Sequence, residues 1–142
     1  MRLRFVVIPI CAVSILAGCA GSSTAPSAAP LIIEGTLLVP ILLEGGSVVN
    51  FQSPRDGTIS ASADWTDSAK DIDILLFPRT CSILQIAQGI IGCLFQDIIG
   101  ADETQQKPAV FSVTATESGA YTLAVRNFAD AAELVTYRIE IK

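Results

Sequence analysis

Histidine is absent from this chain of 142 residues. That absence removes the usual general base, the usual proton shuttle and the commonest zinc ligand. It excludes the pairing of a serine or cysteine nucleophile with histidine. Neither a Gly-x-Ser-x-Gly motif nor a phosphate-binding loop is present. We therefore expect a protein that is not an enzyme and has no catalytic residues.

Positive charge is also scarce. The chain has 9 basic and 14 acidic residues, a formal charge of −5, and no basic stripe. Because a protein that binds nucleic acid presents a basic surface to the phosphates, we expect no nucleic-acid partner. The length suits one folded domain.

No apolar run reaches the roughly 20 residues that span a bilayer. The run over residues 5–16 is shorter, follows Arg2 and Arg4, and is typical of a secretory signal. It ends in Leu-Ala-Gly-Cys19, which resembles the lipobox of bacterial lipoproteins. The resemblance implies a signal peptide over residues 1–18 and a diacylglycerol on the Cys19 thiol. The alternative is an ordinary signal peptide with an unmodified cysteine.

Residues 19–30 follow as the lipidated cysteine and a tether of small residues and proline, which we expect to be flexible. Acyl chains such as palmitate would anchor the chain stably. Cleavage would leave 7 basic and 14 acidic residues, a charge of −7 that anionic headgroups repel. We expect a lipid-anchored protein of the bacterial cell envelope. Because Ala20 and not aspartate follows Cys19, the resemblance implies the outer membrane if the host has two membranes.

Residues 31–142 alternate apolar and polar side chains with a period of two, which predicts half-buried strands. Turn signals such as "SPRDG" and "ESG" separate them. No convincing helical stripe is present, although one turn is expected near residues 129–134. We predict an all-β fold, an antiparallel sandwich of about eight strands. The predicted strands cover residues 31–39, 47–53, 57–65, 71–77, 82–86, 93–99, 109–115 and 119–126, with 134–141 as a ninth.

Four segments follow one another along the chain: "F-x-S-P-x-D-G-T-I-S-A-S-A-D-W", "D-I-D-I-L-L-F", "S-G-A-Y-T-L-A-V-R-N-F" and "Y-R-I-E-I". Together they resemble the bacterial pre-peptidase C-terminal (PPC) domain over most of residues 31–142. The resemblance implies a jelly-roll-like sandwich that is not itself catalytic. Its relatives usually trail secreted peptidases, and some bind collagen, polysaccharide or calcium. This chain departs from the family because no peptidase precedes the domain within these residues and because it carries an apolar, cysteine-bounded insert.

The insert begins with "CSILQIAQGIIGC". Cys11 would leave with the signal and Cys19 would be acylated, so Cys81 and Cys93 remain in a compartment that oxidises thiols. We expect a disulfide between them, which would stabilise the fold by about 3 kcal/mol. A zinc site needs more ligands, and a redox pair needs Cys-x-x-Cys spacing.

The insert, residues 81–99, is also rich in isoleucine and leucine. These side chains either cover one end of the sandwich or form an exposed patch that docks a partner. Gly89 and Gly92 would permit the tight turn that both arrangements need. Trp65, in phase with the apolar side of its strand, is expected in the core, the alternative being a sugar-stacking platform. Tyr121 and Tyr137 are expected in the core as well.

The stretch "DWTDSAKDID" holds four carboxylates in ten residues. Asp64 ends one predicted strand, and Asp71 and Asp73 share a face of the next. If the two strands pair, their charges repel unless Lys70 or Arg79, backbone N–H groups of the turn, or a calcium ion offsets them. We favour polar turn chemistry, with Asp71 and Asp73, joined by Asp64, as the ligands if calcium binds. A catalytic pair among the four carboxylates Asp64, Asp67, Asp71 and Asp73 is the third alternative.

Three functions from different classes follow. The first is a non-catalytic, lipid-anchored interaction or structural module of the envelope or cell surface. The second is a module that binds polysaccharide or a matrix protein, which exposed aromatic side chains in a groove would favour. The third is an accessory domain of a secreted peptidase. No cofactor is expected apart from calcium. The sequence does not identify the partner, the envelope type or the oligomeric state.

Overall fold

A computed structural model describes residues 28–41 and 46–142 of the chain. The expected signal peptide, Cys19 and most of the tether lie outside these residues, so the expectations for them stay predictions. Within the described part, no helix is both long enough and apolar enough to cross a membrane.

The described residues form eight strands and two short helices, which confirms the all-β prediction. The strands are β1 (Leu31–Val39), β2 (Ser47–Ser53), β3 (Gly57–Trp65), β4 (Ile72–Phe77), β5 (Gly100–Asp102), β6 (Ala109–Ala115), β7 (Gly119–Asn127) and β8 (Glu133–Ile141). The helices are α1 (Ile83–Ala87) and the 3-10 helix η2 (Phe95–Asp97).

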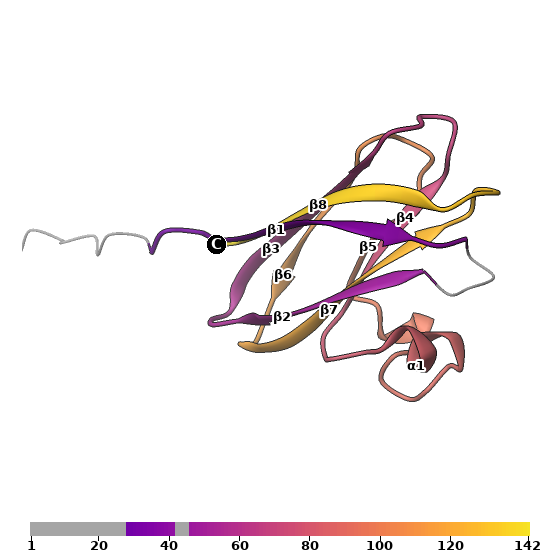
Figure 1. The fold of residues 1–142 in the computed structure, drawn as a ribbon. Coiled ribbons are helices and arrows are strands. Elements are labelled where there is room, and N and C mark those ends of the chain that lie inside the picture. Colours follow the sequence, from indigo (N-terminus) through magenta and orange to yellow (C-terminus); the bar gives the residue numbers. More distant parts are fainter. Residues whose placement is uncertain (1–27, 42–45) are drawn as a thin grey trace, which may run out of the picture.

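The strands lie in two antiparallel four-stranded sheets (Figure 1). The first sheet has the order β1-β8-β3-β6 and the second has the order β2-β7-β4-β5. The pairs β1 with β8, β2 with β7, β3 with β6 and β4 with β5 are nested, as in one long hairpin. Successive pairs fall alternately into the two sheets, which is the wrapping of a jelly roll. The fold is therefore a jelly-roll β-sandwich, as predicted.

In the first sheet, every second side chain along a strand points into the space between the two sheets. On β3, Ile59, Ala61, Ala63 and Trp65 are buried, whereas Asp64 is exposed. Trp65 is only 3% exposed, which confirms that it belongs to the core. Tyr121 is buried there too, and Tyr137 packs against the core while partly exposed.

The central strands of the second sheet, β4 and β7, are buried on both faces where residues of the 81–99 insert pack on their outer side. All six residues of β4 are buried. Ile72, Ile74 and Leu76 face the first sheet, whereas Leu75 and Phe77 belong to a second apolar cluster beneath the insert. The prediction that the insert covers one end of the sandwich is therefore corrected. It covers the outer face of a sheet.

Two of the predicted strands are wrong. Residues 82–86 are largely the helix α1, and residues 93–99 contain the 3-10 helix η2. The short strand β5 follows them and pairs with β4. Apolar content alone does not distinguish a strand from a helix, and here it includes side chains that cover the neighbouring sheet, such as Ile86 and Ile98. The helical turn expected near residues 129–134 does not form, because residues 129–131 are bends and β8 begins at Glu133.

Candidate functional site

The carboxylate-rich stretch links the two sheets. β3 ends at Trp65 in the first sheet and β4 begins at Ile72 in the second, so these strands do not pair. The prediction that Asp64 faces Asp71 and Asp73 across a ladder is therefore wrong. Asp64 instead lies 3.3 Å from the Lys107 ammonium, and one of its oxygens accepts a hydrogen bond from the Trp65 N–H at 3.0 Å.

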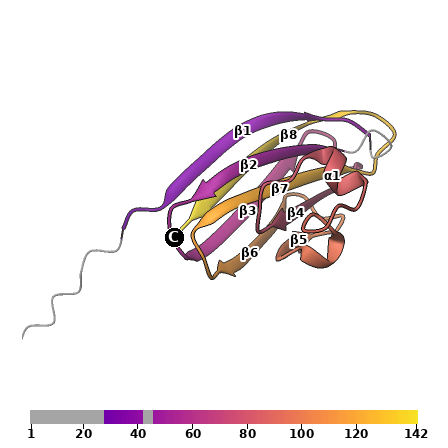
Figure 2. The same cartoon turned by 90° about the horizontal axis from the view of Figure 1, so that it is seen from below.

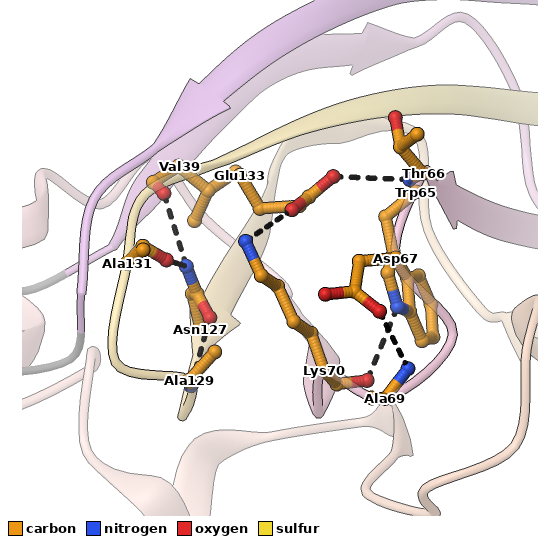
Figure 3. A network of polar contacts seen from close by, with 10 residues as sticks. All are labelled: Val39, Trp65, Thr66, Asp67, Ala69, Lys70, Asn127, Ala129, Ala131 and Glu133. Carbon is orange, nitrogen blue, oxygen red and sulfur yellow. Dashed lines mark hydrogen bonds and ion pairs between the residues drawn. The ribbon is translucent and has the colours of Figure 1, made fainter.

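Polar turn chemistry explains the middle of this stretch (Figure 3). The Asp67 carboxylate accepts a hydrogen bond from the Ala69 N–H at 3.0 Å, and the Trp65 indole N–H donates to the Lys70 carbonyl at 3.1 Å. An aspartate that bonds the backbone two residues later is a common turn former. The loop therefore fixes the tryptophan ring as well as the chain direction.

Lys70, one of the groups offered to offset the aspartate charges, pairs with a glutamate instead. Its ammonium lies 2.6 Å from Glu133, whose other carboxylate oxygen accepts the Thr66 N–H at 3.0 Å. The hydrogen bond from Lys70 lowers the pKa of Glu133, and the same bond raises the pKa of Lys70. Asn127 donates to the carbonyls of Val39 and Ala131, so it holds the neighbouring loop ends together (Figure 3).

Asp71 directly precedes β4, and Asp73 is the second residue of that strand. Asp73 is 5% exposed and pairs across the ladder with Arg126 of β7. Burial first, and then the charge of Asp71, raises the pKa of Asp73 from 3.8 to about 6, although the positive charge of Arg126 opposes the shift. One Asp71 oxygen is buried without a hydrogen-bond partner. The cation that faces Asp73 is thus Arg126, not Lys70 or Arg79.

No group of three or more acidic, cysteine or histidine side chains in residues 28–41 and 46–142 is arranged to hold a metal ion. Asp64 lies in the first sheet and Asp71 and Asp73 lead into the second. A calcium ion takes six to eight oxygens. The three predicted ligands are therefore not brought together by a shared ladder, and turn chemistry is the better description of the stretch.

The insert begins with a short helix that has a complete capping box. The Ser82 hydroxyl accepts the Gln85 N–H at 3.2 Å, while the Gln85 side chain accepts the Ser82 N–H at 2.8 Å. These two bonds satisfy backbone groups that a helix start otherwise leaves unpaired. The sequence signal Ser-x-x-Gln was available, and it outweighs the apolar run that suggested a strand.

Cys81 and Cys93 are bonded to each other, with their Cα atoms 6.0 Å apart. The predicted disulfide is therefore present in the structure. Both cysteines are buried against Leu75 and Phe77 of the second sheet. The Cys81 N–H also donates to the Thr122 hydroxyl of β7 at 2.7 Å, so the disulfide holds the insert against the sheet as well as closing it.

The turn between α1 and the second cysteine depends on glycine. Gly89 and Gly92 both have positive φ, at 63° and 92°, as predicted for this turn. A side chain at Gly92 would also meet the Arg79 guanidinium at 2.0 Å. The backbone conformation favours glycine there, whereas the Arg79 guanidinium is the end of a flexible side chain that can shift.

The insert also exposes large apolar side chains, alongside the exposed polar residues Gln85, Gln88 and Gln96. Five of its large apolar side chains are exposed, and Ile91 is 88% exposed, Leu84 61% and Phe95 57%. We call this group the apolar surface of the insert; its members are Leu84, Ile90, Ile91, Phe95 and Ile99. The insert thus covers a sheet face with some of its apolar side chains and exposes others, whereas docking of a partner stays a prediction.

Arg126 links the carboxylates to this surface. Its guanidinium lies 5.0 Å from the ring centroid of Phe95 in the insert and 4.6 Å from that of Phe128. Such cation–π contacts orient both rings. Sequence reasoning missed this role of Arg126 because Phe95 reaches it only through the packing of the insert.

These features define a class: a jelly-roll β-sandwich in which a disulfide-closed insert covers one sheet and presents apolar side chains to solvent. No protein-family model matches the chain, and no curated protein matches it. Among solved structures, the crystal structure of the Yersinia pseudotuberculosis-derived mitogen is similar at 13% identity and a TM-score of 0.42, over 80% of this chain and 86% of that one. That likeness is too low to carry an argument. The fold assignment rests on the strand pairings described above.

Proposed function

We propose that this protein is a non-catalytic interaction module, tethered to a bacterial envelope membrane through Cys19, that docks a protein partner on the apolar surface of its insert. The observation that carries the proposal is the exposure of that surface. A side chain such as Ile91, which is almost fully exposed, adds nothing to the core. Clusters of exposed apolar side chains are typical of docking sites.

The position of the insert relative to the tether supports this arrangement. The chain enters the sandwich at Leu31, at the end of the molecule where the C-terminus also lies (Figure 1). Both views place α1 toward the opposite end (Figure 2). A domain tied to a membrane through residues 19–30 would thus hold its insert away from that membrane.

The chemistry of the insert favours an apolar groove on the partner. Asp97 is the only charged residue between positions 81 and 99, and its carboxylate already accepts the Leu94 N–H at 3.0 Å. Apolar side chains are stabilised when they leave water and pack against other apolar groups. The two rings stacked on Arg126 give one side of this surface a fixed shape.

Catalysis is not part of the proposal. The sequence has no histidine, and the buried carboxylate of Asp73 lies opposite Arg126 near the start of β4. The polysaccharide alternative has less support, because the exposed rings of Phe95 and Phe128 both stack on that arginine. The peptidase-accessory alternative is favoured by no feature of the described residues.

The docking proposal is tested with a charge placed on the insert. In living cells, a photo-crosslinking side chain at position 91 should capture a discrete partner, which mass spectrometry identifies. The purified partner should then bind the wild type but not Leu84→Asp/Ile91→Asp. A matched control, Val110→Asp/Thr114→Asp, adds the same charge to exposed positions of β6 and should bind normally. Equal binding by both variants would reject the insert as the docking site.

The anchor is tested separately. Cells supplied with a fatty-acid probe should label the wild-type protein and not Cys19→Ala. The variant should also leave the membrane fraction, because the acyl chains supply the attachment. If both proteins are labelled equally, the lipidation proposal is wrong, whereas the docking result above stands on its own.

A further inference from the structure

The β1 edge of the first sheet is a second exposed surface. β1 is the outermost strand of that sheet and pairs only with β8 among the described residues. β1 is nine residues long and runs along the edge of the sandwich (Figure 2). A long edge strand exposes a row of backbone N–H and C=O groups that can pair with another strand.

The register shows which backbone groups of β1 are free. Thr58 of β3 and Lys142, just beyond β8, exchange both hydrogen bonds, at 3.0 and 2.9 Å. Because such pairs alternate along antiparallel strands, even-numbered residues of β8 bond β3 and odd-numbered ones bond β1. The pairing of Leu31 with Ile141 then directs the odd-numbered residues of β1 toward β8.

The even-numbered residues of β1 therefore point their N–H and C=O groups away from the sheet. They are Ile32, Glu34, Thr36 and Leu38. The Leu38 carbonyl accepts a hydrogen bond from the Ser47 hydroxyl at 2.9 Å, which agrees with this direction. A carbonyl oxygen has a second lone pair, so it remains able to accept from another strand.

β1 has few of the features that keep natural edge strands apart. It contains no lysine, arginine or proline, and its register with β8 runs without a bulge from Leu31 to Val39. Its one charge, Glu34, already forms an ion pair with Arg138 of β8. Ile32 and Leu38 are 43% and 68% exposed, so apolar side chains as well as backbone groups remain uncovered.

We infer that β1 is a homotypic interface, at which two copies of the chain pair antiparallel and join their first sheets into one of eight strands. The strand is self-complementary about Gly35. With Gly35 on the two-fold axis, Ile32 of one copy lies opposite Leu38 of the other, and Glu34 lies opposite Thr36. Every outward-facing backbone group of the strand then has a partner.

Neighbouring registers are worse. A shift of two residues in one direction places Glu34 opposite its own copy, and like charges facing across a ladder are destabilising. A shift in the other direction places Ile32 opposite Pro40, which has no N–H to donate. A shift of one residue would oppose free groups to groups already bonded to β8. The sequence of β1 therefore specifies a single self-pairing register.

The side chains at the joint agree with this register. On the outer face, Leu38 is paired with Leu134 of β8, which is 56% exposed. In the dimer these two leucines would adjoin Ile32 of the other copy, and the symmetry repeats the cluster. The pairing thus removes exposed apolar surface at both ends of the interface.

The test is the oligomeric state of the purified full-length protein in detergent, measured by sedimentation at increasing concentration. The wild type should form dimers. Thr36→Pro removes one outward N–H and leaves the bonds to β8 in place, so it should be monomeric. Thr36→Ala keeps the N–H and should remain dimeric. A wild type that stays monomeric at every concentration would overturn the inference, as would a dimeric Thr36→Pro.

A charge exchange tests the register itself. Ile32→Lys/Leu38→Lys places lysine opposite lysine at both ends and should weaken the dimer about tenfold or more. Ile32→Lys/Leu38→Glu changes the same exposed positions but places lysine opposite glutamate, so it should dimerise better than the first variant. Equal dimerisation of the two variants would contradict this register. Because both variants leave the insert intact, failure here does not affect the docking proposal.

Discussion

The two sheets of this sandwich treat their outer faces in opposite ways. The first sheet leaves its outer face open, so β8 alternates between buried and exposed positions. The second sheet lies under the insert, and β4 is buried at every position. The comparison shows that β4, which is apolar apart from Asp73 and does not alternate, lies under a covered part of its sheet. It also places the two proposed interfaces, the insert and the β1 edge, on different sheets.

The largest effect is expected beneath the insert. Phe77→Ala should lower the free energy of unfolding by about 3–5 kcal/mol, because Phe77 is fully buried between β4 and the insert. Val110→Ala, at an exposed position on the first sheet, should change it by no more than about 0.5 kcal/mol. Urea denaturation measures both. Similar values for the two would show that the insert does not cover the sheet in solution.

Removing the disulfide should have the next largest effect. Cys81→Ala/Cys93→Ala should lower the free energy of unfolding by about 2–4 kcal/mol, because the unfolded insert is no longer constrained. Its loosening should also uncover Leu75 and Phe77 and increase the binding of a hydrophobic dye. The first sheet should keep its hydrogen-exchange protection. An unchanged denaturation midpoint in the variant would contradict the stabilising role of the bond.

Substitution of Asp73 should have a smaller effect on the free energy of unfolding, and it should raise that free energy. Its pKa is raised to about 6 in the folded protein, so the folded state binds the proton more tightly than the unfolded state does. Stability contributed by protonated Asp73 is complete below about pH 4 and is lost as the pH rises to about 6. Asp73→Asn should therefore stabilise the protein at pH 7 by about 1–2 kcal/mol, with partial solvent screening allowed for.

Thermal or urea unfolding between pH 4 and pH 7 checks this prediction. Asp102 provides a control of the reverse sign. Burial raises its pKa, but hydrogen bonds from Val110 and Thr104 outweigh that and hold the pKa below its ordinary value. Asp102→Asn should thus destabilise the protein at neutral pH. A pH profile of Asp73→Asn that matches the wild type would show that Asp73 titrates normally.

The smallest effect is expected from calcium. Addition of calcium should move the melting temperature by no more than about 1 °C. Only an ion that binds the native state raises the melting temperature, and we expect no such binding. Asp64 is paired with Lys107, apart from the strand that carries Asp73. A rise of several degrees that disappears in Asp71→Asn/Asp73→Asn would instead establish a calcium site at the start of β4.

The sequence by itself determined the eight-stranded class of the fold and most strand positions. Alternation over residues such as Ile59 to Trp65 reports which side chains face a core, because successive strand residues point to opposite sides. It also determined the pairing of Cys81 with Cys93, since few other thiols were available. These inferences depend on local pattern and on counting.

Only the tertiary structure decided what the apolar insert covers and which charges meet. A buried helix and a buried strand are equally apolar, so α1 was mistaken for a strand. Lys70 reaches Glu133 and Asp73 faces Arg126 because jelly-roll wrapping brings strands from distant parts of the sequence together. Ionic partners of this kind depend on register between strands far apart in the chain, which periodicity within one strand does not specify.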